Sequence, residues 1–126
     1  MKTNKNRPTS LEQAHEMANR PVVDFANFKD LPEDMVAWFN GLYRAAVIGE
    51  AINGENKPDM TNPNTRKWHP WFLHSLGPSG FAFDDSDCGT SSAYAGSGSR
   101  LQYNDSEDSK YSAETFIDVW KDVQLG

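Results

Sequence analysis

Apolar residues recur at helical spacing in three stretches of the chain, and each stretch predicts an amphipathic helix. The first predicted helix covers residues 11–19. Ser10 stands at its N-cap position and Gln13 three residues later, which is the spacing of a capping box. Pro21 cannot continue a helix, so the helix should end before it.

The second predicted helix is the longest and begins at Pro32, a residue that suits the first turn. It should run to about Asn53, where Gly54 supplies a left-handed stop. Gly41 and Gly49 lie inside it, and each costs about 1 kcal/mol relative to alanine. We therefore expect another element to approach the helix closely at both glycines. The apolar stripe consists of Met35, Phe39, Leu42, Tyr43, Ala46, Val47 and Ile52.

The third predicted helix ends the chain. Asp105 or Ser106 serves as its N-cap, and Glu107 and Asp108 complement the positive end of the helix dipole. Its apolar side predicts a buried face against the rest of the fold. That face consists of Ala113, Phe116, Ile117, Trp120 and Val123.

Between the second and third helices the pattern changes to that of strands. Residues 67–72 are dense in aromatic side chains, and Pro70 within them predicts an edge strand or a bulge, because proline lacks a ladder donor. Residues 81–83 place two phenylalanines on one face of a second strand. Residues 100–103 predict a further strand. Residues 84–98 are polar, which leaves a mobile loop and a hairpin of weak strands as alternatives.

Together these elements predict an α+β fold. We expect a small antiparallel sheet of three to four strands, packed by the long central helix and the C-terminal helix. Residues 1–9 are polar and lack periodicity, which predicts a disordered lead. Residues 10–126 then form a single domain.

Composition limits the class of function. The chain has 126 residues, a net charge of −6 and 12% aromatic residues. An acidic balance argues against broad attraction to nucleic acid or to anionic lipid. Cys88 is the single cysteine, so an internal disulfide is excluded and a reducing compartment is favoured. No apolar run reaches the ~18–20 residues of a membrane span. These features predict a cytoplasmic protein.

Metal-ligating residue types occur in two groups without the spacing of known sites. The carboxylate group lacks the glycine and the distal glutamate of a calcium loop, so a solvated loop is the preferred interpretation and cation binding stays open. The second group lacks the paired short spacing of zinc sites. The first group is Asp84, Asp85 and Asp87, and the second is His69, His74 and Cys88.

The sequence predicts no cofactor and no catalytic residue. Cys88 and the serines of residues 97–99 are the available nucleophiles, and no base is ordered beside them. The glycine- and serine-rich residues 96–100 precede a predicted strand, so they lack the helix dipole that strengthens phosphate sites. We therefore predict that the chain is not an enzyme.

Two binding functions remain. A small, acidic, aromatic-rich domain can bind a protein partner or a second copy of itself through an apolar patch. Alternatively, sheet aromatics can stack bases of single-stranded nucleic acid while nearby cations meet the backbone. The cations for this alternative are Arg66, Lys67 and Arg100. Protein binding is the preferred prediction. The candidate binding residues are Trp38, Arg66, Lys67, Trp68, Trp71, Tyr94 and Arg100.

Four signatures spread over residues 31–125 carry a resemblance. They are Glu50-Ala51-Ile52-Asn53; Pro58-Asp59 and Asn62 leading to Lys67-Trp68-His69-Pro70-Trp71-Phe72; Ser79-Gly80-Phe81 with Gly98-Ser99-Arg100-Leu101; and the helix around Phe116 to Asp122. In this combination the chain resembles a family of small uncharacterised proteins of gut Bacteroidetes and their bacteriophages and prophages. Family members usually have a cysteine and an aromatic residue at the two positions where this chain has Gln102 and Tyr103, so the chain departs from the family at the cysteine. The resemblance implies a viral or prophage context and transfers no activity.

Overall fold

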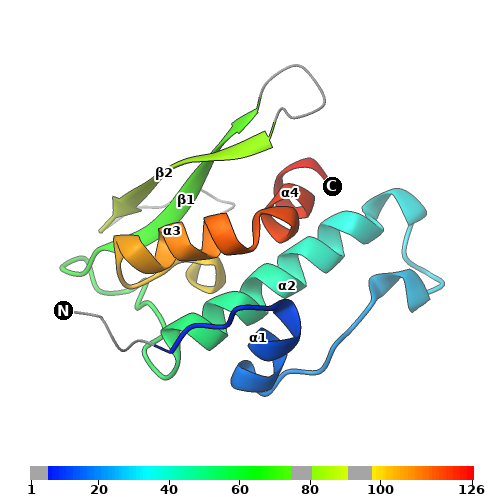
Figure 1. The fold of residues 1–126 in the computed structure, drawn as a ribbon, viewed down its shortest axis with the longest axis horizontal. Coiled ribbons are helices and arrows are strands. Elements are labelled where there is room, and N and C mark those ends of the chain that lie inside the picture. Colours follow the sequence, from blue (N-terminus) through cyan, green and yellow to red (C-terminus); the bar gives the residue numbers. More distant parts are fainter. Residues whose placement is uncertain (1–5, 75–80, 91–97) are drawn as a thin grey trace.

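The computed structural model describes residues 6–74, 81–90 and 98–126. It has an α+β fold, as the sequence predicts, with the long helix α2 running across the molecule (Figure 1). Helix α1 packs on α2, α4 packs along α2, and α3 contacts both strands of a β-hairpin. The elements in chain order are α1 (Leu11–Ala18), η1 (Phe25–Asn27), η2 (Glu33–Met35), α2 (Val36–Asn53), β1 (Lys67–His74), β2 (Phe81–Gly89), η3 (Ser99–Leu101), α3 (Ser106–Thr115) and α4 (Ile117–Leu125).

The first helix confirms the prediction. Ser10 Oγ accepts a hydrogen bond from the backbone N–H of Gln13 at 3.1 Å, and Gln13 Oε1 accepts from the N–H of Thr9 at 2.7 Å. Asn19 ends the helix in the left-handed region, with φ of 53°. The local sequence signals therefore determine both ends of α1.

Helix α2 ends at Asn53, and Gly54 follows it with φ of 61°, as predicted. Its start differs, because Glu33–Met35 form a 3-10 turn and the α-helix begins at Val36. The close approaches expected at the two internal glycines are confirmed. A β-carbon on Gly41 would lie 2.8 Å from Asp122 Cβ of α4, and one on Gly49 would lie 2.9 Å from the carbonyl oxygen of Arg100.

The single C-terminal helix of the prediction is wrong, because the chain turns at Phe116 and forms two helices. Phe116 has φ of −116° and ψ of 39°, which lies outside the helical region. Helix α3 contacts the hairpin and α4 contacts α2, so one straight helix would not serve both surfaces. Of the two predicted caps, Asp105 takes the role, and its Oδ1 accepts from the N–H of Asp108 at 2.8 Å.

The described residues form a sheet of two antiparallel strands, so the predicted three to four strands are not confirmed. The strand predicted at residues 100–103 is wrong. Ser99–Leu101 form a 3-10 turn, and Tyr103 makes an isolated bridge to Trp68. Strand β2 instead continues through Asp84 to Gly89, where the sequence suggested a loop or weak strands. Its polar residues tolerate the strand because alternate side chains face solvent.

Pro70 lies in β1 close to a bulge, in agreement with the predicted alternatives. The register shifts after Trp71, which pairs with Asp85, so Asp84 is the extra residue on β2. Trp68 exchanges both backbone hydrogen bonds with Tyr103, at 2.8 and 2.7 Å. Backbone groups alternate between the two edges of a strand, so Pro70 shares the edge that Trp68 presents to Tyr103. The missing donor therefore lies on the edge away from β2.

The core lies between α2, the α3–α4 pair and the inner face of the hairpin. Ser112 Oγ is its polar centre, because the hydroxyl of Tyr103 donates to it at 2.6 Å and Trp120 Nε1 donates at 3.0 Å. The Trp120 ring also packs 5.6 Å from that of Phe72 in β1. The buried cluster consists of Ala14, Ala45, Val47, Ile48, Ala51, Ile52, Tyr103, Phe116, Val119 and Trp120.

Residues just before α1 lie against α3, in contrast with the predicted disordered lead over residues 1–9. The guanidinium of Arg7 lies 2.9 Å from the buried carboxylate of Asp108 and above the ring of Tyr111. Pro8 is buried, and its carbonyl accepts from the Tyr111 hydroxyl at 2.7 Å. For residues 1–5, which lie outside the described ranges, the disordered lead stays a prediction.

Candidate functional site

Lys67 was predicted to bind a ligand, but the fold itself occupies its side chain. The residue is 4% exposed, and its ammonium donates to the carbonyl oxygens of Asn62 and Thr90, both at 2.5 Å. These bonds join the loop before β1 to the end of β2. The ammonium is therefore not accessible to the phosphate of a nucleic acid bound at the surface.

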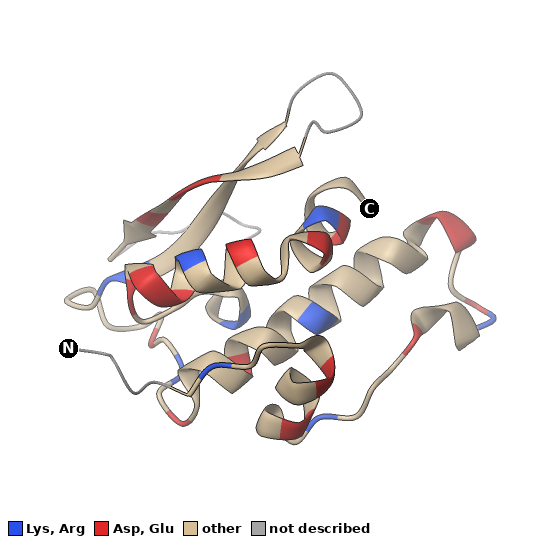
Figure 2. Cartoon of the chain, in the orientation of Figure 1, with Lys and Arg blue, Asp and Glu red and all other residues tan. Residues whose placement is uncertain are grey.

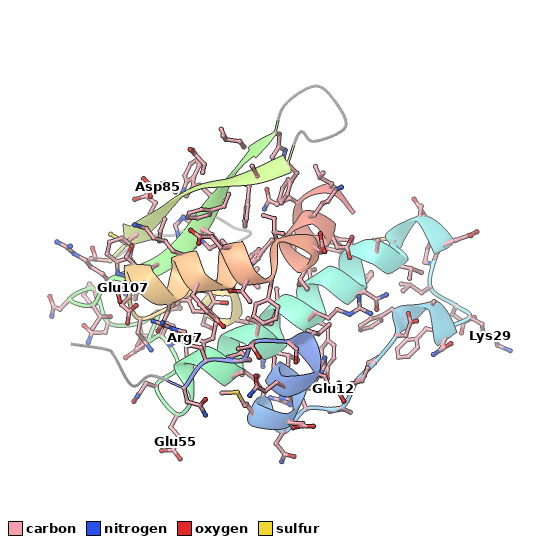
Figure 3. The ribbon with its side chains drawn as sticks, viewed as in Figure 1. Arg7, Glu12, Lys29, Glu55, Asp85 and Glu107 are labelled. Atoms are coloured by element: carbon pink, nitrogen blue, oxygen red, sulfur yellow. The ribbon has the colours of Figure 1, made fainter. Side chains whose placement is uncertain are left out.

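The two predicted tryptophans of β1 lie on opposite faces of the hairpin. Trp68 is half-buried and packs against the core. Trp71 is 41% exposed, and its Nε1 donates to His69 Nε2 at 3.1 Å. Its cross-strand neighbour is Asp85, which Figure 3 shows directed away from the helices. A carboxylate beside the exposed ring opposes a nucleic-acid backbone.

The remaining predicted cations do not join Trp71. Arg66 is exposed just before β1. Arg100 reaches Glu50 of α2, with Nη1 at 3.0 Å from Oε1. Tyr94 lies outside the described residues. The structure thus does not bring Trp71, Lys67 and Arg100 together as a base-stacking site would need.

The residues considered as metal ligands are divided between the two faces of the hairpin. His69 pairs across the strands with Asp87, whereas Cys88 pairs with Trp68 on the inner face. Asp85 and Asp87 each accept, through Oδ1, the N–H of the following residue at 2.8 Å. Within residues 6–74, 81–90 and 98–126, no three His, Cys, Asp or Glu side chains lie together as a metal site would require.

An aromatic lobe, residues 22–39, projects at the start of α2 (Figure 1). Its rings contact one another in series, with Phe25 at 5.0 Å from Phe28 and 5.6 Å from Phe39. Trp38 packs edge-on against Phe39 at 5.2 Å, and the tryptophan stays 36% exposed. The lobe exposes four large hydrophobic side chains, which are Val22, Phe28, Met35 and Trp38.

A groove of about 680 Å³ lies between this lobe and α4. We call it the acidic groove. Figure 2 shows acidic residues in η2, just before α2, and along the connector that precedes it. Among the described lining residues, three are carboxylates from separate segments and one is a lysine. The apolar lining is Ala26, Phe28, Leu31, Val36 and Ala37, and the charged lining is Asp24, Glu33, Asp122 and Lys29.

The carboxylate of Asp24 is fixed at this groove. Its Oδ1 accepts the N–H of Ala26 at 2.9 Å and Nδ2 of Asn40 at 3.1 Å. These bonds, first that from Ala26 and then that from Asn40, lower the pKa of Asp24, with a smaller contribution from the charge of Arg44. Asp24 therefore keeps its charge under mildly acidic conditions.

A second pocket, of about 410 Å³, lies at the other end of α2. We call it the arginine pocket, after Arg20 and Arg100. Arg20 binds Glu50 through two hydrogen bonds, from Nε at 2.8 Å and from Nη2 at 3.0 Å. Arg100 binds the same carboxylate. The pKa of Glu50 is lowered, chiefly by the hydrogen bond from Arg20.

Sequence reasoning selected Arg100 and Trp38 but missed Arg20, Glu50 and Asp24. Arg20 and Glu50 are 30 residues apart in the sequence, and Arg100 lies 50 residues after Glu50. No local spacing signals such a convergence. Only the docking of α1 and η3 on α2 produces it.

Comparison of the chain with family models, with curated proteins and with solved structures gives no match. The resemblance to proteins of gut Bacteroidetes and their phages therefore stays a prediction. In the described part of the chain, none of the helices has both the length and the apolar character that crossing a membrane requires.

Proposed function

We propose that this chain is a non-enzymatic binding protein whose acidic groove holds a basic, partly apolar segment of a partner protein. The resemblance supports the context of a phage or prophage accessory protein in the cytoplasm of a bacterial host. The composition of the groove carries the proposal. Apolar side chains of the connector and α2 lie beside carboxylates from three separate segments. Lysine and arginine side chains match such a lining, because their aliphatic stems cover apolar surface while the charged heads reach carboxylates.

Charge favours this partner over a second copy of the chain. Figure 3 shows Lys29 at the outer tip of the lobe with its side chain directed away from the helices. Asp24, Glu33 and Asp122 therefore dominate the field at the groove. Each copy carries a net charge of −6, so two copies repel one another, whereas a basic segment is attracted.

The hairpin edges support the groove as the binding surface. Pro70 removes a donor from the outer edge of β1. On β2, the N–H groups of Ser86 and Cys88 bond to the carboxylates of Asp85 and Asp87. Partner strands add to a sheet through such backbone groups, and at these positions Pro70 lacks the donor while the donors of Ser86 and Cys88 are occupied. Binding by strand addition is thereby disfavoured.

Calorimetric titration with two peptides tests the proposal. One peptide alternates lysine and leucine, and the other has glutamate in place of each lysine. We expect the basic peptide alone to bind, with an affinity that falls as salt rises. A variant with Asp24→Asn, Glu33→Gln and Asp122→Asn should weaken binding by about tenfold or more, or about 1.4 kcal/mol. Asparagine at position 24 keeps the oxygen that caps η1.

A matched control removes the same amount of charge elsewhere. Glu12, Glu107 and Glu114 are exposed on α1 and α3, away from the groove. Changing all three to glutamine should leave the affinity for the basic peptide unchanged. If both triple variants lose affinity for the basic peptide equally, the binding is nonspecific charge attraction and the proposal is refuted. Light scattering could instead show a dimer of the wild type that dissociates in the groove variant. That result would assign the groove to a second copy of the chain and would also refute the proposal.

A further inference from the structure

The arginine pocket lies where the ends of α1 and α2 meet η3. Its lining residues lie at one end of α2 and those of the acidic groove at the other end, so an inference from it does not rest on the protein-binding function. We propose that this pocket binds a small ligand that carries an oxyanion, either a phosphate monoester or a carboxylate. Three features carry the proposal: its charge, its hydrogen-bond donors and its shape.

The pocket is positive in an acidic protein. Its described lining contains three cations and two carboxylates, an excess of one positive charge, whereas the whole chain carries −6. The cations are Arg20, Lys57 and Arg100, and the carboxylates are Glu50 and Glu55. An anion is therefore attracted to this concave surface and repelled by most of the rest.

The donors are already oriented. A guanidinium presents about five N–H groups in a planar fork. Arg20 uses two of them on Glu50 and Arg100 uses one, so within the described part of the chain most donors of both arginines remain for a ligand. The hydrogen bonds to Glu50 orient both guanidinium groups and use three of their N–H groups. The side chains of Arg20 and Arg100 are 49% and 60% exposed, so a ligand can reach them.

The shape admits more than a bare ion. The volume of about 410 Å³ falls within the ~300–1,000 Å³ of small-molecule sites. Met17 and Ala18 of α1 give the pocket an apolar wall. Gly49 contributes no side chain, and Asn53 and Ser99 add polar groups. The lining thus suits a compact ligand with an apolar body and an oxyanion at one end.

The competing interpretation is that the two arginines only tie α1 and η3 to α2. Backbone amide NMR titration with adenosine monophosphate, inorganic phosphate and succinate separates the two. We expect saturable shifts for at least one probe, confined to residues 17–20, 49–57 and 99–101. Saturation by the phosphates assigns a phosphate ligand, and saturation by succinate alone assigns a carboxylate. Absence of saturation for all three, or shifts spread over every surface cation, overturns the proposal.

Conservative variants test the role of the fork. Arg20→Lys and Arg100→Lys keep the charge but lose bidentate donation, so each should weaken binding about tenfold, or about 1.4 kcal/mol. Lys110→Gln removes an exposed cation of α3 that lines neither pocket, and it should leave the affinity unchanged. If Arg20→Lys destabilises the fold, the ligand affinity of Arg100→Lys decides the test, because Arg100 is the more exposed of the two arginines. Lysine variants that bind as tightly as the wild type overturn the proposal, because charge without geometry would then suffice.

Discussion

Gly49 lies directly beneath Arg100: a β-carbon at position 49 would stand 2.9 Å from the carbonyl oxygen of Arg100. The missing side chain lets η3 rest on α2. Glu50 is the next residue of the helix, so the same contact brings the Arg100 guanidinium within 3.0 Å of its carboxylate. A glycine that looks unfavourable within a helix thus positions one wall of the arginine pocket.

Gly49→Ala should destabilise the protein. Alanine improves helix propensity by about 1 kcal/mol, but the clash is with backbone, and overpacking of this kind typically costs about 1–3 kcal/mol. We expect a net loss of about 1 kcal/mol in the free energy of unfolding, measured by urea denaturation. Gly98→Ala is the control, because among the described residues nothing lies within 4 Å of its added carbon. A more stable Gly49→Ala protein would show that η3 does not rest on α2.

Trp120→Ala should cost about 3–5 kcal/mol of unfolding free energy, since a large buried ring is lost. Trp120 is 3% exposed, packs on Phe72 and donates to Ser112. Trp38→Ala removes the same side chain from an exposed position and should cost less than about 1 kcal/mol. Similar losses at the two positions in chemical denaturation would contradict the packing of α4.

Lys67→Met should destabilise the protein, because it removes a buried ammonium group that holds two backbone carbonyls. The carbonyls of Asn62 and Thr90 lose their charged donor, and hydrogen bonds to charged groups contribute about 1.5–3 kcal/mol. Arg66→Met, at the exposed neighbouring position, should change stability by less than about 0.5 kcal/mol. Thermal and urea unfolding of the pair measures the difference. Equal effects would return Lys67 to the candidates for ligand binding.

The helices were predictable because their signals are local. Ser10 with Gln13 caps α1, and Gly54 ends α2 with a positive φ. The break at Phe116 has no such local signal, because it arises from packing: α3 contacts the hairpin, whereas α4 contacts α2. Local periodicity continues across that residue, so the sequence alone extends one helix through it.

The sheet was less predictable. In β2, Ser86 and Cys88 face inward in alternation with Asp85 and Asp87, but a bulge at Asp84 shifts this alternation away from that of Phe81 and Phe83. Because the alternation of inward and outward residues shifts at Asp84, the strand does not show one continuous two-residue period in the sequence. Leu101 and Tyr103 alternate as a strand would, yet Tyr103 contributes a single bridge. Its burial comes from Ser112 and the core, which lie outside its local sequence.

Tyr103 should make the protein less stable at alkaline pH. Burial raises the pKa of Tyr103 well above its usual value of about 10, against the smaller opposing effect of the hydrogen bond with Ser112. Below about pH 10 the tyrosine is protonated in both the folded and unfolded states, and its contribution to stability is fully present. Above that pH the unfolded chain releases the proton that the folded protein keeps. The free energy of unfolding should then fall, with a limiting slope of about 1.4 kcal/mol per pH unit from this group.

Tyr103→Phe isolates this contribution, because all other titrating groups are common to both proteins. Near neutral pH the variant should be less stable by about 0.5–1.5 kcal/mol, since the hydrogen bond to Ser112 is lost. Above about pH 10 the difference should shrink and then change sign, because phenylalanine has no proton to release. Urea denaturation of both proteins from pH 8 to pH 11 measures it, a range that spans the usual tyrosine pKa of about 10. A difference that stays constant over the whole range would mean that Tyr103 titrates normally, and hence that water reaches its hydroxyl within the core.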